Sequence, residues 1–377
     1  MTFSMMRCDL RQIDIWNFFK IQSDEMSEYK IALIGFGGVN RALAELVAQN
    51  NSRWERETGF SLKIVGVSDL QFGSAIYEGG IDPTILSRIQ REKGAFGTLL
   101  GGTAAPDTDL VIAASGADIV VEATCTNSQN GEPASSYCQL ALRRGLSVVT
   151  SNKGLAAFHA DALKRIAKEN RAFFEFEGTV MSGTPLIRYA KDSLAGAGLI
   201  GFEGILNGAS NFALSCMESG YIGINEAVKK ARTLGYADVD PSMDIDGHDV
   251  RLKVTILANE LLGAQLQPKD VICEGISGLT PQAVQDALAA NARWKLIGSA
   301  MKDPDGHIRA SVRPKLLPLE SALAGVQGAM NAVTFKTKIL GDVTVRGPAA
   351  GRSETAYGLL SDIINIAKEQ TTRTSSK

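Results

Sequence analysis

The stretch KIALIGFGGVNRALAELVAQN, residues 30–50, decides the fold expected for this chain. It begins with a short apolar run that ends in glycines, and it continues with apolar residues at helical spacing. This order predicts a strand, a tight turn and a helix, which is how a βαβ unit begins. The turn Gly35-Phe36-Gly37-Gly38-Val39-Asn40 has the first two glycines of GxGxxG, and its backbone N–H groups can hold a pyrophosphate at the helix N-terminus. We therefore expect a dinucleotide-binding domain.

Asn40 and Asp69 refine this expectation. Asn40 replaces the third glycine, which normally lets helix and strand pack closely, so we expect a looser junction or a polar contact to the cofactor. Asp69 ends the next apolar run, at 62–69, where a carboxylate can accept hydrogen bonds from the adenosine ribose and repel a 2′-phosphate. This favours NAD over NADP. A nearby polar stretch carries cations that could reach a phosphate and keep NADP open, namely Arg88, Arg91 and Lys93.

Two more apolar runs, at 117–124 and 146–153, alternate with helical stretches. They predict a Rossmann-type α/β fold with a doubly wound parallel sheet, whose ligands bind at the carboxyl edge. Hydroxyl groups at these strand exits are the expected cofactor contacts, although a simple Ser/Thr turn is the alternative. They belong to Thr124, Thr126 and Ser151.

The pattern changes after Lys153. Strands expected at 172–180 and 199–206, followed by amphipathic helices near 222–234 and 247–263, predict a second, α+β domain for catalysis and dimerisation. The chain closes on an apolar helix, which we expect to return to the first domain. The expected division is an N-terminal extension at 1–28, disordered or folded as a short helix, a nucleotide-binding domain at 29–152 plus 346–372, and a second domain at 153–345.

Composition excludes several classes of function. The chain has 377 residues and a formal net charge of −2, so no broad basic surface points to nucleic acid or anionic lipid. No apolar stretch reaches the roughly 18 residues of a membrane helix, and the charged first residues do not resemble a secretion signal. The five cysteines are scattered, with no CxxC pair, which fits reduced thiols in a cytoplasm. A small-molecule ligand is the better expectation.

Two lysines are placed for alcohol oxidation, which needs a group that takes the hydroxyl proton as hydride leaves. Lys153 follows the fourth strand at the carboxyl edge, and a desolvated lysine can be tuned for this work. Lys253 lies four residues after Asp249, so both share one face of a helix. The same spacing is common in surface salt bridges, but the density of carboxylates here suits a ligand with an ammonium group. These carboxylates are Asp238, Asp240, Asp244, Asp246 and Asp249.

The segment GYADVDPSMDIDGHDVRLK, residues 235–253, resembles the signature of the homoserine dehydrogenase family. The likeness runs from about 29 to 370 and includes TSNKG, EGTVMSGTPLI, GILNGASNF and GPAAGRSETAYGLLSDI in the family's order. The resemblance implies NAD(P)-dependent interconversion of L-homoserine and L-aspartate 4-semialdehyde, in the biosynthesis of threonine, methionine and isoleucine. In this carry-over Lys253 donates and accepts the proton, Lys153 lies near cofactor and substrate, and Asp249 engages the substrate or orients Lys253.

Further contacts follow from the same resemblance. It implies substrate binding by Asp238, Asp244, Gly208 and Ser210, and a cofactor contact at Gly351. It implies a monovalent cation, sodium with a structural role, on one carboxylate and three main-chain carbonyls at Glu177, Val180, Ser182 and Thr184. An oxygen-only ligand set fits such a hard cation, although Glu177 could equally be an ordinary strand carboxylate. The resemblance also implies a homodimer, and we expect no regulatory domain of the kind that many relatives append.

Departures from the family pattern leave alternatives open. Ala209 replaces a threonine, Asp238 stands where glutamate is usual, and Pro348 and Ala349 interrupt a glycine run. A missing hydroxyl and a shorter carboxylate could favour a related amino alcohol over homoserine. A cofactor-binding homologue without activity is a second alternative. A third is an acylating semialdehyde dehydrogenase that uses Cys125 as nucleophile, although no histidine lies in a recognisable base motif.

Overall fold

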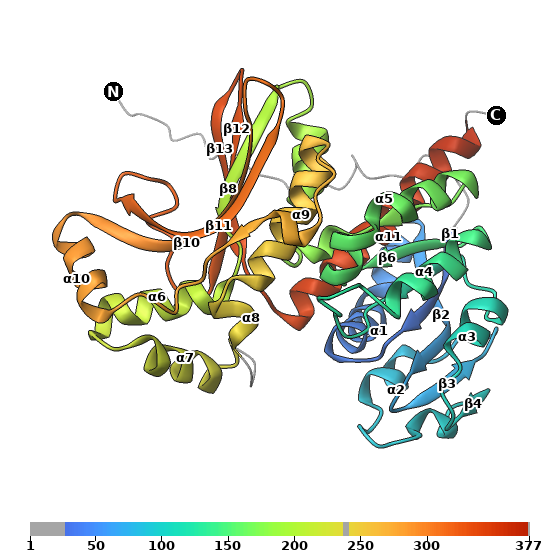
Figure 1. Cartoon of the computed structure of the whole chain (residues 1–377). Helices are drawn as coiled ribbons and strands as arrows, with labels where there is room; N and C mark the ends of the chain where they lie inside the picture. Colours follow the sequence, from blue (N-terminus) through green and yellow to red (C-terminus); the bar gives the residue numbers. More distant parts are fainter. Residues whose placement is uncertain (1–26, 237–240, 376–377) are drawn as a thin grey trace, which may run out of the picture.

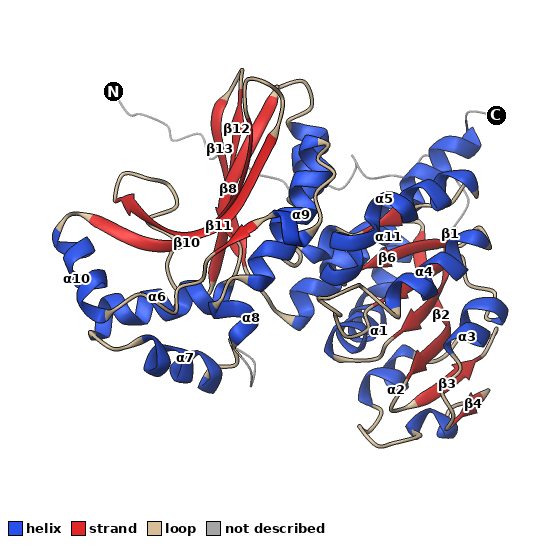
Figure 2. Cartoon of the chain, in the orientation of Figure 1, coloured by secondary structure: helices blue, strands red, loops and turns tan. Residues whose placement is uncertain are grey.

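The computed structural model describes residues 27–236 and 241–375, which form two lobes (Figure 1). The proposed N-terminal extension and Asp238 lie outside the described residues. One lobe contains a seven-stranded sheet and the other a six-stranded sheet, each packed against helices (Figure 2). The predicted combination of a Rossmann-type domain and a second sheet domain is therefore confirmed.

The first sheet has the order β4-β3-β2-β1-β5-β6-β7. Strands β2, β1, β5, β6 and β7 run parallel, while β3 and β4 add an antiparallel edge. The strands are β1 (Ser27–Ile34), β2 (Phe60–Asp69), β3 (Gly73–Ile76), β4 (Gly102–Thr103), β5 (Ile119–Glu122), β6 (Ser147–Thr150) and β7 (Phe174–Glu175). The helices are α1 (Gly38–Thr58), α2 (Pro83–Arg88), α3 (Thr108–Ala114), α4 (Ala134–Arg143), α5 (Lys153–Glu169) and α11 (Arg352–Ser375).

The turn between β1 and α1 is held tightly. Gly35 has φ +75°, and a Cβ there would lie 2.8 Å from the backbone of Thr124, so only glycine fits. Asn40 is fully buried, and its side-chain Nδ2 donates to the carbonyl oxygens of Ile34, Gly35 and Val121. The expected looser junction is therefore wrong. The amide fastens α1 to two central strands and replaces the close packing that a third glycine gives.

The second sheet has the order β13-β12-β8-β10-β11-β9 and is antiparallel except where β9 meets β11. Its strands are β8 (Leu199–Ile205), β9 (Ile272–Cys273), β10 (Ala292–Lys302), β11 (Ile308–Pro318), β12 (Met330–Thr337) and β13 (Gly341–Pro348). The helices of this lobe are α6 (Gly208–Gly220), α7 (Ile224–Thr233), α8 (Ser242–Ile245), α9 (His248–Leu262) and α10 (Pro281–Ala289). Helices α7 and α9 lie within the two amphipathic stretches that the sequence predicted.

The boundary between the lobes differs from the expectation. Strand β7, which helix α5 connects to β6, belongs to the first sheet. The first domain therefore extends beyond Lys153, and the boundary predicted at 152/153 comes too early. The last helix does return to the first domain: α11, drawn in red, lies among the blue and green elements (Figure 1). Its residues Ala356, Leu359 and Ile363 join the apolar core of β1 and β2. Among the described residues, no helix is long and apolar enough to cross a membrane.

Candidate active site

A buried carboxylate between two lysines lies where the lobes meet. Asp249 Oδ2 is 2.7 Å from Lys253 Nζ, and its Oδ1 is 3.0 Å from Lys153 Nζ. Asn207 Nδ2 donates to Asp249 Oδ2 at 2.9 Å and to Asp244 Oδ1 at 2.7 Å. Asp249 is 6% exposed. The predicted catalytic residues are thus brought together, with Lys153 from the first α/β unit and the other groups from the second lobe.

Local structure explains this convergence. Helix α9 starts after Gly247, which has φ +83°, and buries Val250, Val254 and Leu257 against the second sheet. Lys253 and Asp249 are four residues apart on this helix, so they face the same way. Lys153 is the first residue of α5, at the carboxyl edge of the parallel sheet. The side chain of Asn152 caps α5 by accepting from the Leu155 N–H, which fixes where the helix begins.

Burial and charge set the proton affinities at the centre. Burial lowers the pKa of Lys253, the nearby Asp249 carboxylate raises it, and the Lys153 ammonium lowers it. Lys253 Nζ also donates to the Leu206 carbonyl at 2.6 Å. Burial would raise the pKa of Asp249, but the two ammonium groups and Asn207 hold it well below its ordinary value. Burial and the Asp249 charge raise the pKa of Asp244.

This centre faces a cavity of 870 Å³ that both lobes line. Ten of the predicted site residues line it: Val39, Thr124, Thr126, Ser151, Lys153, Gly208, Asp244, Asp249, Lys253 and Gly351. Ser182, one of the predicted cation ligands, lines it too. The cavity thus joins the start of α1, the strand exits of the first sheet and the lysine–carboxylate centre. Cys125 is exposed and does not line the cavity.

Other predicted residues lie beside the cavity. Gly35, Phe36, Gly37 and Gly38 form the turn into α1. Ser210 is 1% exposed, and its N–H donates to the side chain of Asn207, so it belongs to the cap of α6. The Asp69 carboxylate accepts the backbone N–H groups of Phe36, Gln71 and Phe72.

Two parts of the cavity were not predicted. Asn207 holds both Asp244 and Asp249, but an asparagine before a helix is typical of an ordinary N-cap, so its sequence gave no separate signal. The segment 326–330 forms the wall next to Gly208 and Ala209, and its residues 327–330 line the cavity. A glycine-containing stretch between strands predicts only a loop.

The four predicted cation ligands lie in one segment, in which Glu177, Val180 and Ser182 are buried and Thr184 is half-buried. Met181 and Ser182 both have positive φ, at +59° and +53°, which non-glycine residues rarely adopt. Within residues 27–236 and 241–375, no hydrogen-bond donor contacts the main-chain oxygens of Val180, Ser182 or Thr184. Buried carbonyls without donors are uncommon, and a cation is one way to satisfy them.

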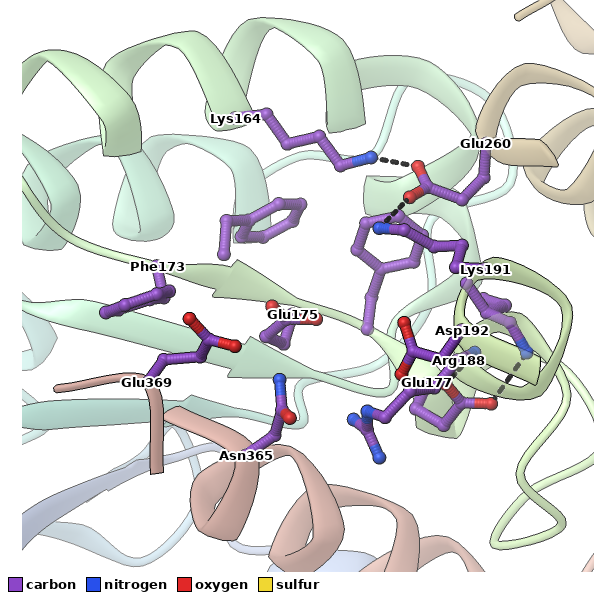
Figure 3. A pocket seen from close by; sticks show the side chains of 13 residues that line it. Lys164, Phe173, Glu175, Glu177, Arg188, Lys191, Asp192, Glu260, Asn365 and Glu369 are labelled. Atoms are coloured by element: carbon purple, nitrogen blue, oxygen red, sulfur yellow. Dashed lines mark hydrogen bonds and ion pairs between the residues drawn. The ribbon is translucent and has the colours of Figure 1, made fainter. Parts of the chain in front are cut away.

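Glu177 has a structural role as well. Its carboxylate accepts the backbone N–H groups of Leu186, Ile187 and Arg188 and so caps the following helical turn. Figure 3 shows it beside a second cavity of 370 Å³, where Lys164 and Lys191 both contact Glu260. This cavity lies apart from the lysine–carboxylate centre, and none of the three groups of that centre lines it.

The glycine turn of a Rossmann-type sheet lies beside the cavity that the buried lysine–carboxylate centre faces, an arrangement typical of an NAD(P)-dependent oxidoreductase. The comparisons identify the family. A family profile described as homoserine dehydrogenase matches residues 185–364. A Pseudomonas canavaninivorans protein named NAD(+)-dependent homoserine dehydrogenase is 56% identical over 346 residues, covering 92% of this chain and 98% of that protein. The chain therefore belongs to the homoserine dehydrogenase family.

Other relatives agree. The Methanocaldococcus jannaschii homoserine dehydrogenase is 34% identical, over 89% of this chain and 98% of that protein. A crystal structure of a putative homoserine dehydrogenase from Archaeoglobus fulgidus superposes with a TM-score of 0.78 at 33% identity, covering 90% of this chain and 99% of that one. A hyperthermophilic archaeal homoserine dehydrogenase in complex with NADPH superposes with a TM-score of 0.76 at 29% identity, covering 91% and 98%.

Proposed function

We propose that this chain interconverts L-homoserine and L-aspartate 4-semialdehyde, with Lys253 as the group that takes and returns the hydroxyl proton. The observation that carries this proposal is the Lys253–Asp249–Lys153 cluster at the edge of the 870 Å³ cavity. When bound, the nicotinamide cofactor supplies the hydride acceptor, and the protein's task is to bind the alcohol and move one proton.

Lys253 suits proton transfer because burial favours its neutral amine while nearby acceptors stabilise its ammonium form. Burial disfavours the ammonium form and lowers the pKa of Lys253, so the neutral amine that can accept the hydroxyl proton forms more readily here than on an exposed lysine. Once the amine is protonated, Asp249 Oδ2 at 2.7 Å and the Leu206 carbonyl at 2.6 Å stabilise the ammonium. The same two acceptors orient the amine, and the reverse reaction returns the proton.

The neighbouring groups position the reactants. Asp249 aligns both lysines, and Asn207 donates a further hydrogen bond to its Oδ2, the oxygen that Lys253 also contacts. Lys153 lies close enough to the strand exits to bridge cofactor and substrate. Asp244 offers a carboxylate in the same cavity for the substrate ammonium, and Asp238 would add a second one. Gly208 and the helix turn capped through Ser210 border this substrate end of the cavity.

For the cofactor we propose NAD, with NADP as the weaker alternative. Gly35, Phe36, Gly37 and Gly38 would bind the pyrophosphate at the start of α1. The rest of the dinucleotide would contact residues that line the adjoining cavity, namely Val39, Thr124, Thr126, Ser151 and Gly351. Asn40 is buried and would hold the turn in place through its hydrogen bonds to backbone carbonyls. Asp69 is tied to this turn through the Phe36 N–H, and its negative charge disfavours a 2′-phosphate. The Pseudomonas relative named NAD(+)-dependent supports the same preference.

We also propose a structural monovalent cation, sodium, on the turn of Glu177, Val180, Ser182 and Thr184. The donor-free carbonyls and the left-handed backbone at 181–182 support it. The Glu177 carboxylate gives three of its acceptor positions to backbone N–H groups and retains capacity for one more contact. From the family resemblance we also propose a homodimer and a place in threonine, methionine and isoleucine synthesis, and from the scattered cysteines we propose a cytoplasmic location.

A substrate panel tests the proposed reaction. Nicotinamide reduction should be measured with L-homoserine and with longer 4-hydroxy amino acids, using NAD⁺ and NADP⁺ separately. We expect turnover of homoserine, with a higher kcat/KM for NAD⁺. Turnover of only a longer amino alcohol would favour the related-substrate alternative, and no turnover of any amino alcohol would favour the inactive homologue.

A further inference from the structure

One wall of the catalytic cavity rests on a buried lysine in the second sheet. The wall is the segment 326–330, of which Gln327, Gly328, Ala329 and Met330 line the cavity. A Cβ added to Gly208 would lie 3.1 Å from the Ala329 carbonyl oxygen, so the wall touches the first residue of α6. It therefore faces Gly208 and Ala209, where the sequence departs from the family pattern.

Lys295 is this buried lysine. It lies on β10 and has no exposed surface. Its Nζ donates to the Val326 carbonyl at 2.8 Å and to Asn211 Oδ1 at 3.1 Å. Burying a lysine is costly unless its ammonium is hydrogen-bonded, and here its bonding partners are the wall and one asparagine. It contacts neither Asp249 nor Lys253 and is not part of the proton-transfer centre.

The ammonium also decides how Asn211 is oriented. An ammonium can only donate, so it must face the side-chain oxygen of Asn211. The Nδ2 of Asn211 then points at the wall and donates to the carbonyls of Val326, Gly328 and Met330, at 3.2, 2.9 and 3.2 Å. Without the Lys295 ammonium, no charge favours the orientation of the Asn211 side chain in which Nδ2 faces the wall over the flipped one. The three wall contacts therefore depend on the lysine.

A second pair of contacts holds the same segment. Gln327 Nε2 donates to Glu218 Oε2 at 2.9 Å, and the Gly328 N–H donates to Ser215 Oγ at 3.0 Å. Burial lowers the pKa of Lys295, the Glu218 carboxylate raises it and the Arg293 guanidinium lowers it, and these two charged groups pair with each other. All these supports come from α6 and β10, which lie next to each other in the second lobe (Figure 1). The wall is thus fastened from behind, on the side away from the cavity.

We propose that Lys295 and Asn211 are positioning residues that hold the 326–330 wall against α6 and thereby set the affinity for the amino-alcohol substrate. This inference rests on the proposed function for its substrate. It goes beyond it by assigning substrate affinity to two residues that do not contact the substrate. Because the wall meets Gly208 and Ala209, its position also fixes how long a substrate the cavity accepts.

The test uses Lys295→Met and Asn211→Asp in the full chain. Lys295→Met keeps the side-chain length but removes the donor, while Asn211→Asp keeps an oxygen for Lys295 but removes the amide that donates to the wall. In each variant we expect the KM for homoserine to rise roughly tenfold, because hydrogen bonds that hold the wall are lost. The dissociation constant for NADH, measured by fluorescence, should change by less than about twofold, since the wall lies away from the glycine turn. The double variant should resemble the single ones, because both remove one coupled unit.

Val284→Ala is the matched control. Val284 on α10 is 1% exposed and belongs to a different apolar cluster from Val326, so the substitution lowers stability without removing a contact to the wall's apolar residue. Its KM should stay at the wild-type value, and an equal rise of KM in this control would overturn the proposal. Unchanged KM in both wall variants would overturn it as well.

Amide hydrogen exchange at 326–330 gives a readout that needs no turnover. We expect faster exchange there in Lys295→Met and Asn211→Asp than in the wild type, and no change in Val284→Ala. If the wild type does not oxidise homoserine, the proposed substrate fails while exchange still decides the positioning role. Unaltered exchange in both variants would refute that role whatever the substrate is.

Discussion

Replacing Asp249 by asparagine isolates the electrostatic part of the active site. The carboxylate is 2.7 Å from Lys253 Nζ and 3.0 Å from Lys153 Nζ, and it is 6% exposed. Asparagine has nearly the same shape and can still accept one hydrogen bond, so the main change is the loss of a negative charge between two lysines. Lys253 then keeps the two influences that lower its pKa, burial and Lys153, and loses its closest anion.

The size of the effect follows from the contact. The Asp249 carboxylate raises the pKa of Lys253, so this pKa should fall in Asp249→Asn. Loss of one partner from a buried ion pair costs about 3–5 kcal/mol of stability, and the lower end applies because Lys153 is partly exposed. The weaker and less well aligned base should reduce kcat by roughly a hundredfold.

The assay is the pH dependence of kcat/KM for homoserine oxidation in the wild type and in Asp249→Asn. The rising limb reports loss of the proton from the base in the free enzyme. We expect this limb at lower pH in the variant, with unfolding in urea confirming that it is folded. A limb at the same pH in both proteins would show that Asp249 does not set the proton affinity of the catalytic base.

Three further outcomes are expected. Lys153→Met removes a cation that lowers the pKa of Lys253, so the rising limb of the pH dependence of kcat/KM should move to higher pH. A shift to lower pH, as expected for Asp249→Asn, would contradict the assignment of Lys253 as the base. Burial lowers the pKa of Lys295 to about 8 from 10.5, so between these pH values the unfolded chain binds more protons than the folded one. The free energy of unfolding of the wild type, measured in urea, should therefore rise relative to that of Lys295→Met by up to about 3 kcal/mol between pH values of about 7 and about 10. Sodium should raise the melting temperature relative to tetramethylammonium at equal ionic strength, and this difference should shrink in Glu177→Gln; equal melting temperatures in both salts argue against the cation.

Periodicity and spacing predicted much of this molecule because they act locally. The glycine turn after an apolar strand placed β1 and α1, and the four-residue spacing of Asp249 and Lys253 placed both groups on one face of α9. The convergence of Lys153 with them depends on the packing of α5 against α9, a contact between segments almost a hundred residues apart. Only the family resemblance anticipated that contact.

Other features depend on where a side chain points. Asn40 was expected to loosen a junction that its three hydrogen bonds in fact fasten, because the sequence does not show which carbonyls an amide can reach. Lys295 lies in a strand with mixed polarity, where a lysine usually extends to solvent, so nothing marked it as buried. The early domain boundary has a similar origin, since two-residue strands such as β7 are too short to carry a periodic pattern.

The central claim is that Lys253 exchanges the hydroxyl proton. The most direct measurement compares wild type and Lys253→Ala in single-turnover reduction of NAD⁺ by L-homoserine, with NADH binding measured on the same preparations. The account predicts a fall of roughly a hundredfold or more in the rate of hydride transfer, with the NADH dissociation constant unchanged within about twofold. A rate within a few-fold of the wild type would contradict it.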